Sequence, residues 1–153
     1  MLIPAFAAFA HHLAAFALVA ALVVELVALR GELTVASARR LLNADLIYGI
    51  AAGAIVLIGI ARVIWFEKSA GYYLHSAPFI AKMILFAMIG LISIRPTLTF
   101  LSWRTALAEG RAPTLDAAAQ RRLRSLVHVE LALLAPLILC AALTAKGIGF
   151  FGG

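Results

Sequence analysis

The sequence has little charge and almost no cysteine. Only 13% of its 153 residues are charged, whereas 65% are hydrophobic. Soluble domains carry about 25% charged residues, so this composition argues against an ordinary soluble domain and indicates a membrane protein. The single cysteine, Cys140, excludes an internal disulfide and a metal site made of paired cysteines. A platform of aromatic and basic residues is also lacking, which argues against nucleic acid as a partner.

Four apolar runs are long enough to cross a bilayer, which takes about 20 helical residues. They cover roughly residues 5–29, 44–66, 78–101 and 125–145. The sequence therefore predicts an all-α integral membrane protein, a single four-helix transmembrane bundle formed by residues 1–153. The first run lacks a basic leader and is longer than the apolar core of a secretory signal, so we expect it to remain in the mature chain.

Basic residues are distributed unevenly among the connections between these runs. The first and third connections contain Arg30, Arg39, Arg40, Arg104, Arg111, Arg121, Arg122 and Arg124, whereas the second connection and the tail contain Lys68 and Lys146. The positive-inside rule then predicts a protein of the bacterial inner membrane with both termini on the periplasmic side. Anionic lipid at the cytoplasmic surface accounts for the net charge of +6.

The third connection ends in a polar helical pattern. Gly110 and Pro113 interrupt the chain, and the segment "PTLDAAAQRRLRS" that follows is typical of an interfacial amphipathic helix. We expect this helix to begin at Thr114, as its N-cap, and to continue into the fourth span.

The ionisable residues of the spans form two layers, and each is a candidate functional residue because charge in hydrocarbon is costly. The outer layer contains His11, His12, Arg62 and Lys82, with His75 in the connection above it. The inner layer contains Glu25, Asp45, Tyr48, Arg95, His128 and Glu130. We expect Asp45 and Glu130 to pair with Arg95, because an arginine partner neutralises a carboxylate near hydrocarbon.

Helical geometry distinguishes the two histidines of the first span. His11 is 14 residues from Glu25, so at about 100° per residue their directions differ by roughly 40°. His12 differs from Glu25 by about 140°. If Glu25 faces the bundle interior, His11 faces it too, although both histidines remain candidates.

Two histidines in the outer layer suit haem, since imidazole is a common axial ligand of haem iron. Arg62 and Lys82 then suit the propionates. Copper is the alternative, because imidazole also binds that metal and Met83 lies at a similar depth. Interfacial hydrogen bonding is the third interpretation of the histidine pair.

The segments "AFAHHLAAFALVAALVVELVALRGE" and "LIYGIAAGAIVLIGIARVIWFEKSAGYYLHSAPFIAKMILFAMIGLISIRPTLTFLSWR" carry a resemblance. The whole chain resembles an uncharacterised bacterial family of small four-helix membrane proteins, a domain of unknown function. More remotely, it is similar to the HemJ-type protoporphyrinogen IX oxidases and to copper-resistance D-like membrane domains. HemJ proteins bind haem b, and their early histidine and their lysine at the start of the third helix fall on His11 or His12 and on Lys82. The end "RRLRSLVHVELALLAPLILCAAL", with Glu130 and Pro136, resembles the HemJ terminal helix.

Glu25, Arg62, Arg95 and the histidine pair itself are not placed by the HemJ pattern, so porphyrinogen oxidation does not follow from it. The first function class is a haem b protein that relays electrons or, as an oxidoreductase, oxidises quinol or porphyrinogen. The second is a metal or proton-coupled carrier that uses Glu25, Asp45, Arg95 and His128, against which the apolar middle of each helix argues. The third is an accessory subunit without chemistry. Lipid, a membrane redox partner and a second copy of the chain are the partners expected.

Overall fold

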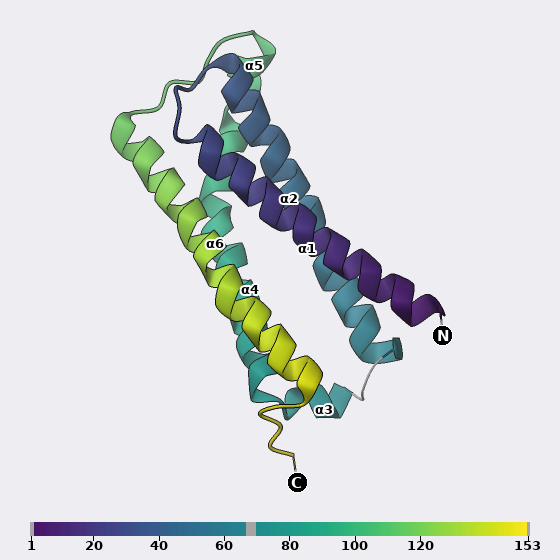
Figure 1. Ribbon diagram of the computed structural model, residues 1–153. Helices are drawn as coiled ribbons and strands as arrows, with labels where there is room; N and C mark the ends of the chain where they lie inside the picture. Colours follow the sequence, from purple (N-terminus) through teal and green to yellow (C-terminus); the bar gives the residue numbers. More distant parts are fainter. Residues whose placement is uncertain (1, 67–69, 153) are drawn as a thin grey trace.

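The computed structural model describes residues 2–66 and 70–152, and four of its helices are long and apolar enough to cross a membrane (Figure 1). Lys68, which entered the charge count, lies outside the described residues. The helices are α1 (Leu2–Ala28), α2 (Val35–Ala61), α3 (Ala70–Leu74), α4 (Ala77–Ser102), α5 (Arg104–Ala108) and α6 (Ala117–Lys146). A π-helical turn, η1 (Arg62–Phe66), continues α2. The prediction of an all-α four-helix membrane protein is confirmed.

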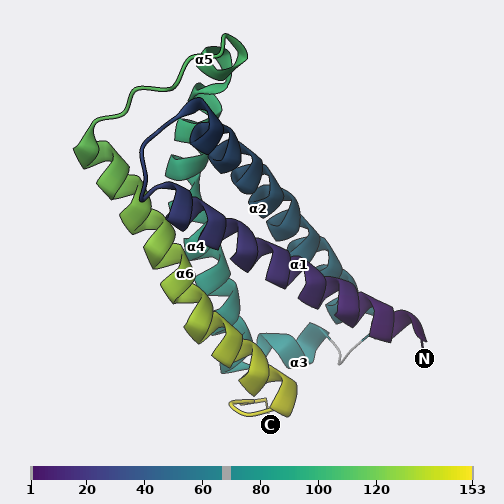
Figure 2. The ribbon, with the colours of Figure 1, turned by 45° about the horizontal axis from the view of Figure 1, so that its top comes forward.

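The four long helices pack as two pairs. α1 packs mainly on α2 and α4 mainly on α6, while α1 with α6 and α2 with α4 share smaller contacts. Figures 1 and 2 show the two pairs close together near α5 and diverging toward the opposite end. We call the end with α5 and the connection 29–34 the arginine end, and the end with both termini and α3 the terminal end.

The core lies toward the arginine end, where most of the buried residues of the four long helices fall. In α1 these are Leu18, Ala21, Leu22 and Glu25, whose spacings of three and four residues place them on one face. On the opposite face, Phe9 and Phe16 are exposed, as expected for side chains that contact lipid. Hydrophobic side chains therefore cover both faces of α1, one facing protein and the other facing the bilayer.

Two helices begin well before the apolar runs that predicted them. Thr34 caps α2, where it accepts a hydrogen bond from the backbone of Ser37 and completes a capping box. Asp116 caps α6 by accepting from the backbone of Ala119, so the prediction of Thr114 as N-cap was wrong. Both helices extend beyond their apolar runs because capped, alanine-rich and arginine-rich segments are good helix formers.

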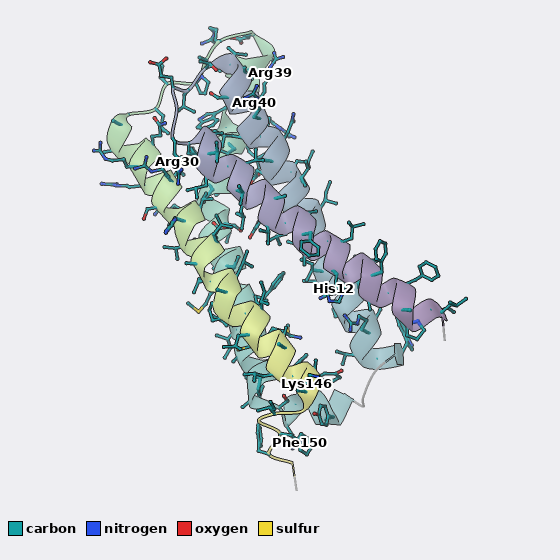
Figure 3. All side chains as sticks on the ribbon, in the orientation of Figure 1. His12, Arg30, Arg39, Arg40, Lys146 and Phe150 are labelled. Carbon is teal, nitrogen blue, oxygen red and sulfur yellow. The ribbon has the colours of Figure 1, made fainter. Side chains whose placement is uncertain are left out.

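The connections at the arginine end are tied to one another. The guanidinium of Arg39 donates to the carbonyl of Leu107, over 3.1 Å. The Gln120 amide donates to the carbonyls of Leu29 and Gly31, over 3.0 and 2.8 Å. Figure 3 places the labelled Arg30, Arg39 and Arg40 at this end, and Lys146 and Phe150 at the other.

The C-terminal tail closes the terminal end of the α4/α6 pair. The Ala77 amide donates to Gly149 and the Phe151 amide to His75, forming a short β-bridge beside the start of α4. Gly149 has a φ of 78°, and a Cβ there would lie 2.8 Å from Cδ of Pro78, so glycine is required for this approach. The tail therefore joins α4 to α6.

Candidate functional site

Three carboxyl groups lie buried in the core of the arginine end, each from a different helix. Glu25 of α1 is 2% exposed, Asp45 of α2 is 7% exposed, and Glu130 of α6 is 1% exposed. Glu25 interacts electrostatically with both Asp45 and Glu130, so the three carboxyl groups lie close together. We call Glu25, Asp45 and Glu130 the acidic cluster.

The acidic cluster receives few hydrogen bonds. Thr97 of α4 donates its hydroxyl to Asp45 over 2.6 Å. Within the described part of the chain, Oε1 of Glu25 and both carboxyl oxygens of Glu130 have no hydrogen-bond partner. Tyr48 of α2 is a hydrogen-bonding neighbour of Glu130, but its geometry falls short of a full hydrogen bond to either oxygen of Glu130. Three carboxyl oxygens, one of Glu25 and two of Glu130, are thus buried without a well-formed hydrogen bond.

Arg95 does not neutralise the acidic cluster. Its side chain is exposed, because the neighbouring Pro96 faces the core and successive residues on a helix point about 100° apart. The expected pairing of Arg95 with Asp45 and Glu130 is therefore not formed among the described residues.

His128 is exposed as well, since the adjacent Val127 fills the core position on α6. The inner layer predicted from the sequence thus separates into a buried acidic part and an exposed basic part. Arg95 and His128 can be exposed because both lie toward the arginine end. There the polar end of each side chain can reach the membrane–water interface.

A groove of about 390 Å³ between α2 and α4 leads to the acidic cluster. Four polar side chains line it together with apolar ones; the lining is Leu42, Asn43, Asp45, Leu46, Gly49, Ile50, Thr97, Leu101 and Arg104. Asn43 and Arg104 are exposed, whereas Asp45 is buried. One member of the cluster therefore faces a space that begins at the arginine end. Sequence reasoning missed this groove and the role of Thr97, because neither can be recognised without knowing that α2 lies beside α4.

His11 and His12 face different surroundings at the terminal end. His11 is half-buried, and its Cε1 lies 3.6 Å from the position that a Cβ of Gly59 would take. This confirms that His11 points toward the bundle, against α2. His12, labelled in Figure 3, is exposed, and its Nδ1 donates to the carbonyl of Ala8 over 2.6 Å. The sequence contained no sign that Gly59 would be the neighbour of His11.

The other candidates of the outer layer also lie at the terminal end. Lys82 of α4 is half-buried, 4.7 Å from the ring centre of Phe79, and follows the buried Pro78 by one helical turn. Arg62 is half-buried in η1, which continues α2. It follows Gly59 by three residues, so the two residues lie on the same side of this continuous helix.

His75 differs from these two residues because it is exposed. Its Nδ1 donates to the carbonyl of Gly71 over 2.8 Å, and its ring lies beside Phe151 with the ring centres 5.8 Å apart. His75 is therefore held by the connection and the C-terminal tail.

No group of three or more His, Cys, Asp or Glu side chains among residues 2–66 and 70–152 is arranged to hold a metal ion. Met83, considered as a copper ligand, is exposed on the outside of α4. A haem site needs fewer protein ligands than a site for a bare metal ion. The porphyrin provides four ligands of the iron, so one or two protein side chains suffice.

Comparison with known proteins identifies a family but no characterised relative. Residues 3–149 match the model of a family described as "Predicted membrane protein (DUF2214)". No curated protein and no solved structure matches the chain. The resemblance to HemJ-type oxidases and copper-resistance D-like domains therefore stays a prediction. The match covers nearly the whole chain, and the protein belongs to this family of membrane proteins, DUF2214.

Proposed function

We propose that this membrane protein binds haem b at the terminal end of the bundle, where His11 would hold the iron, and that it has a redox or electron-transfer role. The observation that carries the proposal is the contrast between the two adjacent histidines. His11 faces α2 beside Gly59, whereas His12 is exposed and bonded to its own helix.

The surroundings of His11 fit a haem in two respects. The two helix pairs diverge at this end (Figures 1 and 2), and most of the buried core lies at the opposite, arginine end. Arg62 and Lys82 are half-buried cations at the same end, and cations of this kind bind haem propionates. A neutral imidazole on a rigid helix supplies a strong iron ligand in a fixed orientation.

Bound haem iron supplies reversible one-electron transfer. The chain's own residues then hold and orient the group: His11 binds, Arg62 and Lys82 neutralise the anionic edge, and the apolar walls of α1 and α2 exclude water. With the arginine end in the cytoplasm, as the positive-inside rule requires, this site lies near the periplasmic face of the inner membrane. A quinol or porphyrinogen dissolved in lipid is the corresponding class of electron donor.

The test compares His11→Gln with His12→Gln, each measured as haem per folded protein after solubilisation in detergent. His11→Gln should lose most of its haem because glutamine provides no comparable ligand nitrogen. His12→Gln is the matched control and should keep its haem. Equal haem content in both variants contradicts the role of His11, and the histidine pair would then be interfacial. Copper bound by the wild type in place of haem would favour the metal-handling alternative.

A further inference from the structure

The acidic cluster at the arginine end has no part in haem binding at the terminal end, and it needs its own explanation. Its three carboxyl groups lie on α1, α2 and α6 and are at most 7% exposed. A buried cluster of acids with so few hydrogen-bond donors is unusual, since buried polar groups are normally hydrogen-bonded. Oε1 of Glu25 and both oxygens of Glu130 lack a partner among the described residues.

Within residues 2–66 and 70–152, no cationic side chain faces the cluster. From α2, Tyr48 faces Glu25 and Glu130 with a neutral hydroxyl, and from α4, Thr97 bonds to Asp45. Arg95 of α4 and His128 of α6 are exposed rather than directed at the cluster. Three carboxylates placed together in such a core would carry a large desolvation and repulsion cost. Binding of protons removes that cost without any further group.

The groove between α2 and α4 provides a route for those protons. Its volume of about 390 Å³ far exceeds that of one water molecule, for which a cavity of about 10–15 Å³ suffices. The polar lining residues Asn43, Asp45, Thr97 and Arg104 offer the hydrogen bonds that ordered water needs. Asp45 is thus the member of the cluster closest to water at the arginine end, while Glu25 and Glu130 lie deeper in the core.

We propose that Glu25, Asp45 and Glu130 form a proton-binding site that exchanges protons with water at the arginine end through the α2/α4 groove. In each binding event a carboxylate oxygen forms an O–H bond with a proton donated by a hydronium ion at the arginine end, which becomes water, and no electron is transferred. A proton fits better than a metal ion, because a metal needs several converging oxygens and the described residues contain no such group. The site does not depend on the presence of haem.

The first experiment labels the solubilised wild-type protein with dicyclohexylcarbodiimide, an apolar reagent that modifies protonated carboxyl groups in membrane interiors, and locates the product by mass spectrometry. Residue 25 or 130 should be modified at neutral pH, and modification should slow several-fold as the pH is raised. Glu32, exposed in the connection between α1 and α2, should remain unmodified and serves as the internal control. Absence of label on the cluster overturns the proposal. Concentration-dependent protection by Na⁺ or Ca²⁺ alone also overturns it, because the cluster would then be a metal site.

The second experiment tests the route by following hydrogen–deuterium exchange of the carboxylic acid C=O band in the infrared spectrum. Gly49 lines the groove and has nothing within 4 Å of a built Cβ, so Gly49→Phe narrows the groove without a clash at that atom. Gly53 is equally open but lies outside the groove, which makes Gly53→Phe the matched control. Exchange should slow several-fold in Gly49→Phe alone. Equal exchange rates in the two variants contradict the proposed route.

Discussion

The two ends of the bundle differ in both packing and charge. At the arginine end, all four long helices contribute to one core, and the buried ionisable groups are acids. At the terminal end the helix pairs diverge, and the half-buried ionisable groups are His11, Arg62 and Lys82. An acid can lose its charge by binding a proton, so it tolerates a closed core. An arginine side chain keeps its charge, and a lysine side chain loses its charge only when deeply buried. Both residues therefore lie where their side chains can reach the membrane–water interface.

This difference indicates that the ends serve separate purposes. The arginine end holds the fold together and contains groups suited to proton exchange. At the terminal end the helix pairs diverge, and this end offers a ligand nitrogen with two cations. Substitutions at each end test this difference.

The largest expected effect is a loss of core packing at the arginine end. Phe100 is fully buried against Trp103, whereas Phe9 of the terminal half is 64% exposed to lipid. Phe100→Ala should lower the free energy of unfolding by about 3 kcal/mol or more, because a cavity remains. Phe9→Ala should change it little. Unfolding in mixed detergent followed by circular dichroism measures both, and equal losses would show that the two ends are packed alike.

A smaller effect is expected for the hydrogen bond that reaches the acidic cluster. Thr97→Val keeps the shape of the side chain but removes the donor to Asp45, which should cost about 2 kcal/mol because a buried oxygen loses its partner. Thr99, which donates to its own helix at Arg95, provides the control Thr99→Val. The same unfolding assay applies. Equal stability of the two variants would mean that the Thr97 hydroxyl does not stabilise the buried carboxyl group.

The smallest effect concerns the tail at the terminal end. Gly149→Ala places a Cβ at a positive φ and against Pro78, which should cost about 1 kcal/mol and loosen the tail locally. Faster hydrogen exchange at the amides of Ala77 and Phe151 should report this, without change in the core. Gly31→Ala, at a site with open space, is the control. Unchanged exchange in Gly149→Ala would show that the tail is not held by this contact.

Properties that depend on one helix at a time could be predicted from the sequence. Hydropathy located all four spans, because the bilayer sets the length of an apolar run. The angle between His11 and Glu25 indicated a shared face, and both do face the protein. The inward orientation of His11 follows from this angle once Glu25 is taken to face the bundle interior.

Properties that depend on the neighbouring helix could not be predicted. Arg95 was expected to pair with Asp45, but the core position next to it is taken by Pro96. Thr97 is the actual partner of Asp45, and Gly59 is the neighbour of His11. Both depend on how α1, α2 and α4 lie against one another. The start of α6 at Asp116 was missed because hydropathy does not record helix capping.

The most direct test of haem binding at the terminal end is the visible spectrum of the purified wild-type protein before and after reduction with dithionite. The account predicts a Soret band and, on reduction, sharpened α and β bands, with haem close to one per chain. A colourless protein, prepared from cells supplied with haem, would contradict the account and favour an accessory subunit without chemistry.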